Sequence, residues 1–272
     1  MRPARCTCNG AAGRADVSRR RERRREADGA AGAFAAGARP PARVGGLDAL
    51  RGLAILAMIA YHFSFDLGHV GLTQWDFYRD PFWLNARTLI LSSFLMIAGV
   101  SLVLADRDHP SPTRFWRHVG TIAACALIVS AASYAMFPAS WIWFGVLHAI
   151  ALSLLLARPL GRHPLIALVI GAAVIAAGNL YTDARFDNRA LGWIGFMTAK
   201  PRTEDYVPLF PWTGVLLLGI ATGHVLARTE FRPIAWAEHV PRSIAWLGRH
   251  SLAAYMLHQP LLLALLYLAT GR

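Results

Sequence analysis

Seven long apolar stretches constrain the fold of this chain more than any other feature. They lie at about residues 47–67, 83–105, 116–136, 140–157, 164–181, 209–227 and 245–268. About 20 helical residues cross roughly 30 Å of hydrocarbon. Only helices or closed barrels satisfy the backbone in lipid, and these stretches lack the alternation of barrel strands. The sequence therefore predicts an all-α, polytopic transmembrane helical bundle of about seven helices, with the fourth and fifth the shortest.

The low share of charged residues also points to lipid as the solvent. Only 16% of the 272 residues are charged, whereas a soluble domain carries about 25%. The net charge is +12, but residues 1–46 hold 11 arginines against four acidic residues and contribute +7 of it. This tail lacks a signal-peptide pattern and is expected to be disordered, unless the true start codon lies further along. The transmembrane domain is expected over residues 47–270, and the basic balance does not indicate nucleic-acid binding.

Sequence motifs for several common chemistries are absent. There is no GxxxxGK[ST], GxGxxG, HExxH or GxSxG, so P-loop hydrolysis, dinucleotide binding, zinc proteolysis and a serine nucleophile elbow have no support. Cys6, Cys8 and Cys125 fit neither a disulfide framework nor a zinc-ligand spacing. We expect no metal site.

The positive-inside rule predicts the orientation of the bundle. With the tail in the cytoplasm, the connections on that side hold Arg107, Arg114, Arg117, Arg158, Arg162, Arg228, Arg232, Arg242 and Arg249. The opposite side holds Arg79, Arg185, Arg189, Lys200, Arg202 and Arg272, most of them near acidic residues. An odd number of spans would leave the C-terminus outside. The outer loop at about 182–207 is either a cover for a site or an ordinary connector.

The first apolar stretch carries a stripe of ionisable side chains. At about 100° per residue, Asp48, Arg51, His62 and Asp66 fall within an arc of about 60° and along about 27 Å of one helix. Asp48 can pair with Arg51, and His62 with Asp66. An alternative for Asp48 and Arg51 is that they only anchor the helix at the interface. His62 lies deep in the span, where such residues normally face a bundle interior or a cavity. A carboxylate one turn away would orient His62 as a general base.

Other apolar stretches carry polar side chains at comparable depth. Arg87 lies just inside the second, His148 inside the fourth, and His258 and Gln259 near the middle of the last, where Pro260 interrupts the hydrogen-bond ladder. A single membrane histidine is usually a packing residue bonded to a carbonyl. Three at similar depth, together with Arg87, instead favour convergence on one site.

Several segments resemble a known family. LDALRGLAILAMIAYHFSFDL, FLMIAGVSL, FGVLHAIALSLLLA, FPWTGVLLLGIATG and LGRHSLAAYMLHQPLL are similar, in this order, to the bacterial branch of the heparan-alpha-glucosaminide N-acetyltransferase catalytic-domain family, over about residues 43–270. The Arg51–His62 spacing also resembles that of membrane O-acyltransferases acting on bacterial polysaccharides. The resemblance implies a bacterial inner-membrane enzyme that transfers acetyl from cytoplasmic acetyl-CoA to a hydroxyl or amine of a sugar or glycan on the far side.

The resemblance suggests roles for the polar residues. His62, oriented by Asp66, would deprotonate the acceptor, and Arg87 and His258 would stabilise charge on the thioester oxygen. Asp48, Arg51 and Arg249 are the candidate contacts for CoA. In the lysosomal animal members the implicated histidine falls in the loop after the first helix. Here that loop begins near His69, so His62 and His69 both remain candidates for the base.

Two other function classes fit the same stripe of polar residues. A transporter or proton-coupled permease would use it to relay protons or bind substrate, although such proteins often show duplicated halves and none is visible here. A non-catalytic membrane partner would tolerate His62→Ala, whereas the other two classes would not.

Overall fold

The computed structural model describes residues 44–108, 111–203 and 205–271, and all its regular elements in these ranges are helical. The tail predicted to be disordered lies almost wholly outside the described residues, as do Cys6 and Cys8. The prediction of an all-α membrane bundle is confirmed. Five helices are long and apolar enough to cross a membrane: α2 (Gly45–His69), α3 (Pro81–Asp108), α4 (Pro112–Met136), α8 (Leu209–Arg228) and α10 (Ser251–Thr270).

Two shorter apolar helices complete the bundle, α5 (Val146–Ala157) and α6 (Pro164–Leu180). They correspond to the fourth and fifth stretches, which the sequence predicted to be the shortest. A non-helical segment at 137–145, with a turn at 138–140, precedes α5, so only part of the predicted 140–157 segment is helical.

The last predicted stretch, 245–268, is wrong as a single helix. The chain forms α9 (Arg242–Arg249), leaves helical geometry at His250 (φ −106°, ψ 26°), and then begins α10. Hydropathy averages across such a break because both helices carry apolar residues. Pro260 lies inside α10, and the helix continues through it to Thr270, so the predicted interruption of the ladder does not end the helix.

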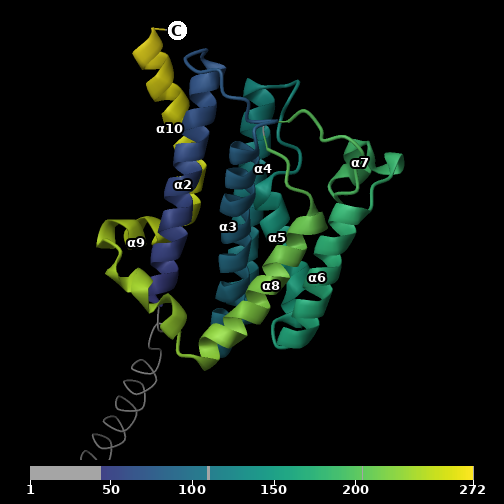
Figure 1. The fold of residues 1–272 in the computed structure, drawn as a ribbon, viewed down its shortest axis with the longest axis vertical. Coiled ribbons are helices and arrows are strands. Elements are labelled where there is room, and N and C mark those ends of the chain that lie inside the picture. Colours follow the sequence, from purple (N-terminus) through teal and green to yellow (C-terminus); the bar gives the residue numbers. More distant parts are fainter. Residues whose placement is uncertain (1–43, 109–110, 204, 272) are drawn as a thin grey trace, which may run out of the picture. The chain divides into compact units, whose positions relative to one another are not determined.

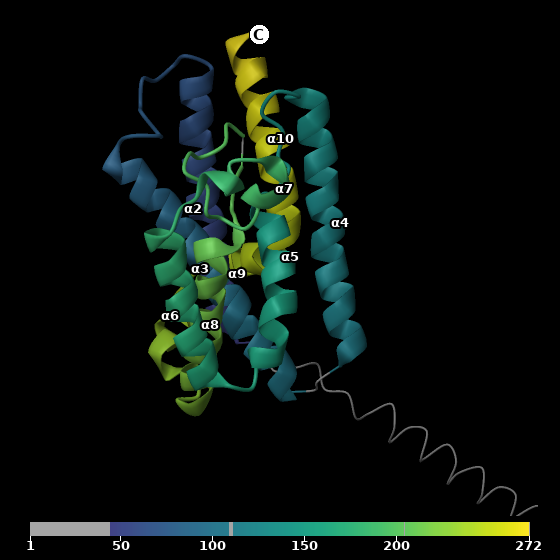
Figure 2. The same ribbon diagram turned by 90° about the vertical axis from the view of Figure 1, so that its right-hand side faces the viewer.

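Successive apolar helices run in alternating directions. Figure 1 shows the start of α2, the ends of α3 and α8, and α9 at one end of the bundle, which we call the lower end. The end of α10 lies at the opposite, upper end, near the end of α2, and α7 (Arg189–Gly192) belongs to the loop of that half. Turned by 90°, the bundle shows α10 beside α4 (Figure 2). Since α10 also packs on α2, the first and last apolar helices are neighbours.

Glycines allow close helix contacts in the core. A Cβ at Gly99 of α3 would overlap the Leu216 carbonyl of α8, and one at Gly171 of α6 would lie 2.9 Å from the Gly214 carbonyl of α8. Small residues of this kind let backbones approach in membrane helix packing. Leu165, Val169, Leu180 and Leu268 are among the apolar side chains left exposed, as expected for a surface covered by lipid.

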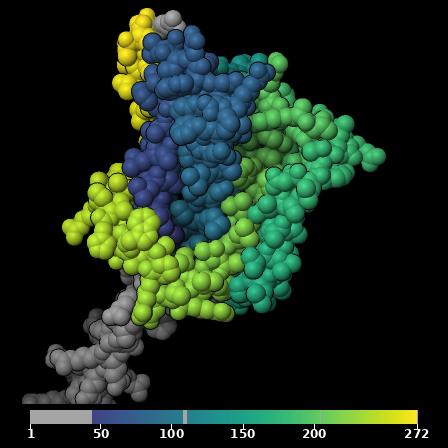
Figure 3. Space-filling view, in the orientation of Figure 1, coloured from purple at the N-terminus to yellow at the C-terminus, as the bar shows by residue number. Residues whose placement is uncertain are grey.

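A second glycine contact fixes α2 against α9. A Cβ at Gly52 would overlap the Ile244 carbonyl, and one at Gly248 would overlap the Asp48 carbonyl. Figure 3 shows the segment of 232–249 lying against the lower part of α2. The glycine of LDALRG and that of LGRHS are therefore parts of one interface, where no larger side chain fits.

Candidate functional site

The stripe on α2 separates into a lower and an upper cluster. In the lower one, Arg51 Nη1 donates to Asp48 Oδ1 at 3.2 Å, which confirms the predicted i,i+3 pair. Arg51 Nη2 also donates to the Ser101 hydroxyl of α3 at 2.7 Å, and Ser101 in turn donates to the Ile97 carbonyl. The guanidinium is thus held between two helices. With 23% of the Arg51 side chain and 15% of that of Asp48 exposed, the pair remains accessible at the lower end.

The upper cluster joins α2 to α10. The rings of His62 and His258 lie with their centroids 4.9 Å apart at 60° to each other. One turn further along α2, the Asp66 carboxylate accepts hydrogen bonds from Gln259 Nε2 at 2.9 and 3.1 Å. Asp66 is 2% exposed and His258 8% exposed. The structure therefore brings together four of the polar residues singled out in the sequence, of which Asp66 and His258 are buried and His62 and Gln259 half-buried. The helix spacing alone did not predict Gln259 as the partner of Asp66.

Hydrogen bonding fixes which nitrogen of His258 carries a proton. Its Nδ1 lies 2.6 Å from the Tyr255 carbonyl oxygen. A carbonyl can only accept, so Nδ1 is the donor, and in the neutral ring Nε2 is left with the lone pair. That Nε2 is buried and has no hydrogen-bond partner among the described residues. A ring held in this tautomer, with its basic nitrogen free, is suited to accept a proton from a substrate.

A loop residue reaches into the bundle beside this histidine. The Tyr255 hydroxyl donates to the Asp205 carboxylate, and the Tyr255 ring centroid lies 5.6 Å from that of His258. Asp205 Oδ2 also accepts a hydrogen bond from the Val146 amide at 2.7 Å. Val146 is the first residue of α5, so the carboxylate lies at the positive end of the helix dipole. Asp205 therefore ties the long upper loop to α5 and α10 at the site.

Two cations, Lys200 and Arg87, act on the charge of Asp205. Burial raises the pKa of the Asp205 carboxyl, against the opposing effects of the Val146 N–H bond, Lys200 and Arg87. Burial, followed by the nearby Arg87 guanidinium, lowers the pKa of Lys200 to about 8, although Asp205 acts in the other direction. Arg87, predicted for the site, thus lies near the Tyr255–Asp205 pair with Lys200. The charges of two cationic groups therefore act on one partly desolvated carboxyl group.

The remaining predicted residues are placed elsewhere. His148 Nδ1 accepts from the Gly145 amide at 3.2 Å, and Nε2 lies 3.3 Å from the Ser130 hydroxyl, so this ring is hydrogen-bonded at the start of α5. His69 is exposed at the last residue of α2, and Arg249 is exposed at the last residue of α9. Among the described residues, no cluster of three or more His, Cys, Asp or Glu could hold a metal ion.

Sequence reasoning missed Tyr255, Asp205, Lys200 and Ser101 as site residues. Tyr255 precedes His258 by three residues and so shares its helix face, a signal that was available in the sequence. Asp205 and Lys200 lie in an irregular loop, where no periodicity indicates which side chains turn inward. Ser101 is one of several serines in apolar stretches, and only the packing of α3 on α2 distinguishes it.

Comparison with known proteins identifies one family. The family model described as heparan-alpha-glucosaminide N-acetyltransferase, catalytic, matches residues 43–260. This range begins before α2 and ends within α10, so it contains both clusters and the loop with Asp205. No curated protein and no solved structure gives a match.

Proposed function

The chain belongs to the heparan-alpha-glucosaminide N-acetyltransferase catalytic family, and from that premise we propose that it transfers acetyl from acetyl-CoA to a hydroxyl or amine of a sugar. It is a membrane protein of a transferase family. The observation that carries the proposal is the buried His258, whose Nδ1–H is committed to the Tyr255 carbonyl while Nε2 keeps its lone pair. A structural histidine would normally have both nitrogens satisfied when buried.

In the proposed reaction, the acceptor oxygen or nitrogen attacks the thioester carbonyl carbon as Nε2 of His258 takes its proton. The tetrahedral intermediate then collapses with cleavage of the C–S bond. The imidazolium returns the proton to the CoA thiolate, so the products are the acetylated acceptor and free CoA. His62, whose ring adjoins that of His258, is the alternative proton acceptor that the sequence predicted.

The polar groups around the two histidines support binding of the acetyl donor on one side of the pair and of the sugar acceptor on the other. Arg51 lies about 16 Å below His62 along α2 and presents a guanidinium at the lower end, suited to the anionic phosphates of CoA. Arg87 and Lys200 lie toward the upper end and would stabilise negative charge on the thioester oxygen or bind an acceptor. We propose that the lower end is cytoplasmic, with acetyl-CoA entering there and the sugar from the far side.

Acetyl transfer by the purified full chain tests this proposal. The chain in phosphatidylcholine nanodiscs is incubated with radiolabelled acetyl-CoA and a panel of hydroxyl and amino sugars, and both CoA thiol release and labelled sugar are measured. We expect both in wild type and neither with His258→Gln, while Arg242→Gln, exposed on α9, behaves as wild type. Equal thiol release by wild type and His258→Gln would remove His258 from the mechanism. Uptake of an unmodified sugar into proteoliposomes would indicate a transporter instead.

A further inference from the structure

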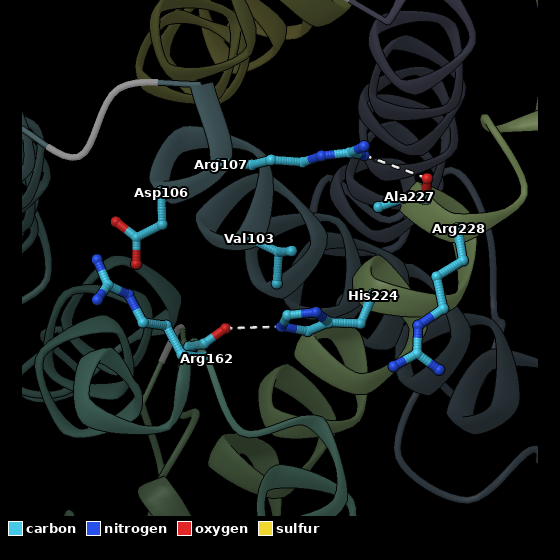
Figure 4. Close-up of a pocket in the computed structure, with 8 residues that line it drawn as sticks. Val103, Asp106, Arg107, Arg162, His224, Ala227 and Arg228 are labelled. Atoms are coloured by element: carbon cyan, nitrogen blue, oxygen red, sulfur yellow. Dashed lines mark hydrogen bonds between the residues drawn. The ribbon is translucent and has the colours of Figure 1, made fainter.

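A basic pocket lies at the lower end of the bundle, away from the two histidines. Its volume is about 380 Å³, and it is formed by the end of α3, the turn between α5 and α6, and the end of α8. Figure 4 shows Arg107, Arg162, Arg228 and His224 around it, with Asp106 beside Arg162. Three guanidinium groups therefore share one cavity with a single carboxylate.

Hydrogen bonds to backbone carbonyls shape this pocket. His224 Nε2 lies 2.8 Å from the Gly161 carbonyl, so it must be the donor, and it holds the α5–α6 turn against α8. Arg107 Nη1 donates to the Ala227 carbonyl at 3.2 Å, which ties α3 to the end of α8. The walls are thus set by contacts that do not involve Arg162 or Arg228.

Arg162 and Arg228 are the groups left to bind a ligand. Neither guanidinium has an ion-pair or side-chain hydrogen-bond partner within the described part of the chain. Guanidinium groups around a concave site favour an anion that can accept several N–H bonds. A phosphate group suits this donor arrangement because its oxygens match the fork of arginine.

The pocket is separated from the acetyl-transfer site by α3. Ser101 of α3 faces α2, where it accepts from Arg51, whereas Arg107 reaches α8. These two residues lie about 120° apart around the helix. A ligand in the pocket therefore sits on the α8 side of α3, whereas Arg51 lies on the α2 side. Basic pockets between membrane helices at the cytoplasmic surface bind phospholipid head groups.

We propose that this pocket binds a phosphate ester at the membrane surface, through Arg162 and Arg228 with Arg107 at its edge. Two sources share that chemistry: the head group of an anionic phospholipid and the phosphates of CoA. The inference does not rest on the proposed acetyl transfer, because binding is measured without turnover. If the chain proves to have no transferase activity, the pocket and its test are unaffected.

Two binding measurements on the full chain separate the sources. In the first, the chain is reconstituted with phosphatidylcholine and a small fraction of phosphatidylglycerol, and retained lipid is counted by native mass spectrometry. In the second, CoA is titrated calorimetrically into nanodiscs of phosphatidylcholine alone. Each arginine near a membrane surface contributes about a fivefold change in affinity for anionic phosphate. Arg162→Gln/Arg228→Gln is therefore expected to lower binding about 25-fold in one arm or both.

The controls isolate the pocket from general surface charge. Arg114→Gln/Arg242→Gln removes the same charge from exposed residues at the lower end, and binding should change less than twofold. Asp106→Asn removes the carboxylate that repels the anion, so binding should tighten in whichever measurement the double arginine variant weakens. A gain of binding cannot come from misfolding, so this variant keeps the test valid if the double variant does not fold. A loss confined to phosphatidylglycerol assigns the lipid, and one confined to CoA assigns the nucleotide. Unchanged binding in both arms, or equal loss in the control, overturns the proposal.

Discussion

His62 of α2 and His258 of α10 face each other with ring centroids 4.9 Å apart, although they belong to the first and last apolar helices. α2 also meets α9, the helix just before α10, at the lower end, where Gly248 packs on the Asp48 carbonyl. The beginning and the end of the family-matched region are thus in contact at two places: the backbones of α2 and α9 meet at Gly248, and the imidazole rings of α2 and α10 meet higher up. The glycine contact sets the position of α9, and α10 follows α9 after one residue. The geometry of the histidine pair therefore depends on the packing below it.

The first prediction separates the two histidines. We expect His258→Ala to lower kcat for acetyl transfer by about 10²–10⁴-fold, the usual contribution of a general base. His62→Ala should lower it less, because only His258 has its tautomer fixed by a backbone carbonyl. Single-turnover kinetics with purified protein measures both, and CoA affinity should be unchanged in each.

His69→Ala provides the internal control for this comparison. His69 is exposed at the end of α2, so its removal should leave the rate within about twofold, as for most surface substitutions. A large loss with His69→Ala and none with His258→Ala would assign the base to the loop histidine and contradict our assignment.

The second prediction concerns the Asp66–Gln259 contact. Gln259→Leu removes both hydrogen bonds to a carboxylate that is 2% exposed. Loss of a partner by a buried charged group costs about 1.5–3 kcal/mol of free energy of unfolding. Thermal unfolding in detergent should show a lower Tm for Gln259→Leu but not for Gln74→Leu, which changes an exposed loop glutamine. Equal melting of wild type and Gln259→Leu would mean that this contact does not stabilise the bundle.

Hydropathy predicted the membrane fold well because burial in lipid is a strong and local requirement. The α6 stretch was predicted at 164–181 and is Pro164–Leu180. The break at His250 was missed because α9 combines exposed arginines with apolar residues, and a window over 245–268 averages them with α10. Length and polarity predict that a segment is helical and apolar, but not where one helix ends against another.

The site was predicted only in part, because the depth of a residue along a helix does not show which neighbouring helix its side chain contacts. His62 and His258 were both singled out and do meet, whereas His148 lies at similar depth and bonds to Ser130 and Gly145 instead. Asp205 gave no sequence signal, since its contact with Tyr255 depends on how a long loop folds over α5. Tertiary packing decided these cases, and no periodicity within one segment could report it.

The third prediction concerns Lys200, which is the only lysine in the sequence. Burial and the nearby Arg87 lower its pKa to about 8, so its amine should react with an amine-directed reagent with a midpoint near pH 8. An exposed lysine would have its midpoint near 10.4. Labelling across pH, read by peptide mass spectrometry, measures this directly, and a midpoint above 10 would contradict the lowered pKa. Arg87→Gln should raise the midpoint because it removes a repelling charge.

The same pKa shift predicts a pH-dependent stability. Between about pH 8 and the unfolded value near 10.4, the unfolded chain holds the Lys200 proton more tightly, so the contribution of this group to stability rises with pH. Below pH 8 the cost of keeping this partly desolvated amine charged is present in full. Lys200→Arg keeps its charge throughout, so its Tm should match wild type at pH 7 and fall below it by pH 10. A constant difference between the two proteins across this range would be inconsistent with the shift.

The last prediction tests the packing on which the histidine pair depends. Gly248→Ala places a Cβ against the Asp48 carbonyl and 2.7 Å from the Gly52 amide nitrogen, both of them backbone atoms that no rotamer change can move. Overpacking of this kind costs about 1–3 kcal/mol, and relief requires α9 to move away from α2. Since α10 begins directly after His250, that movement displaces His258 relative to His62, so Tm and acetyl transfer should both fall. Gly120→Ala is the matched control, because no atom lies within 4 Å of the added Cβ and alanine favours a helix by about 0.5–1 kcal/mol. If Gly248→Ala behaved like Gly120→Ala, the α2–α9 contact would not govern the position of α10.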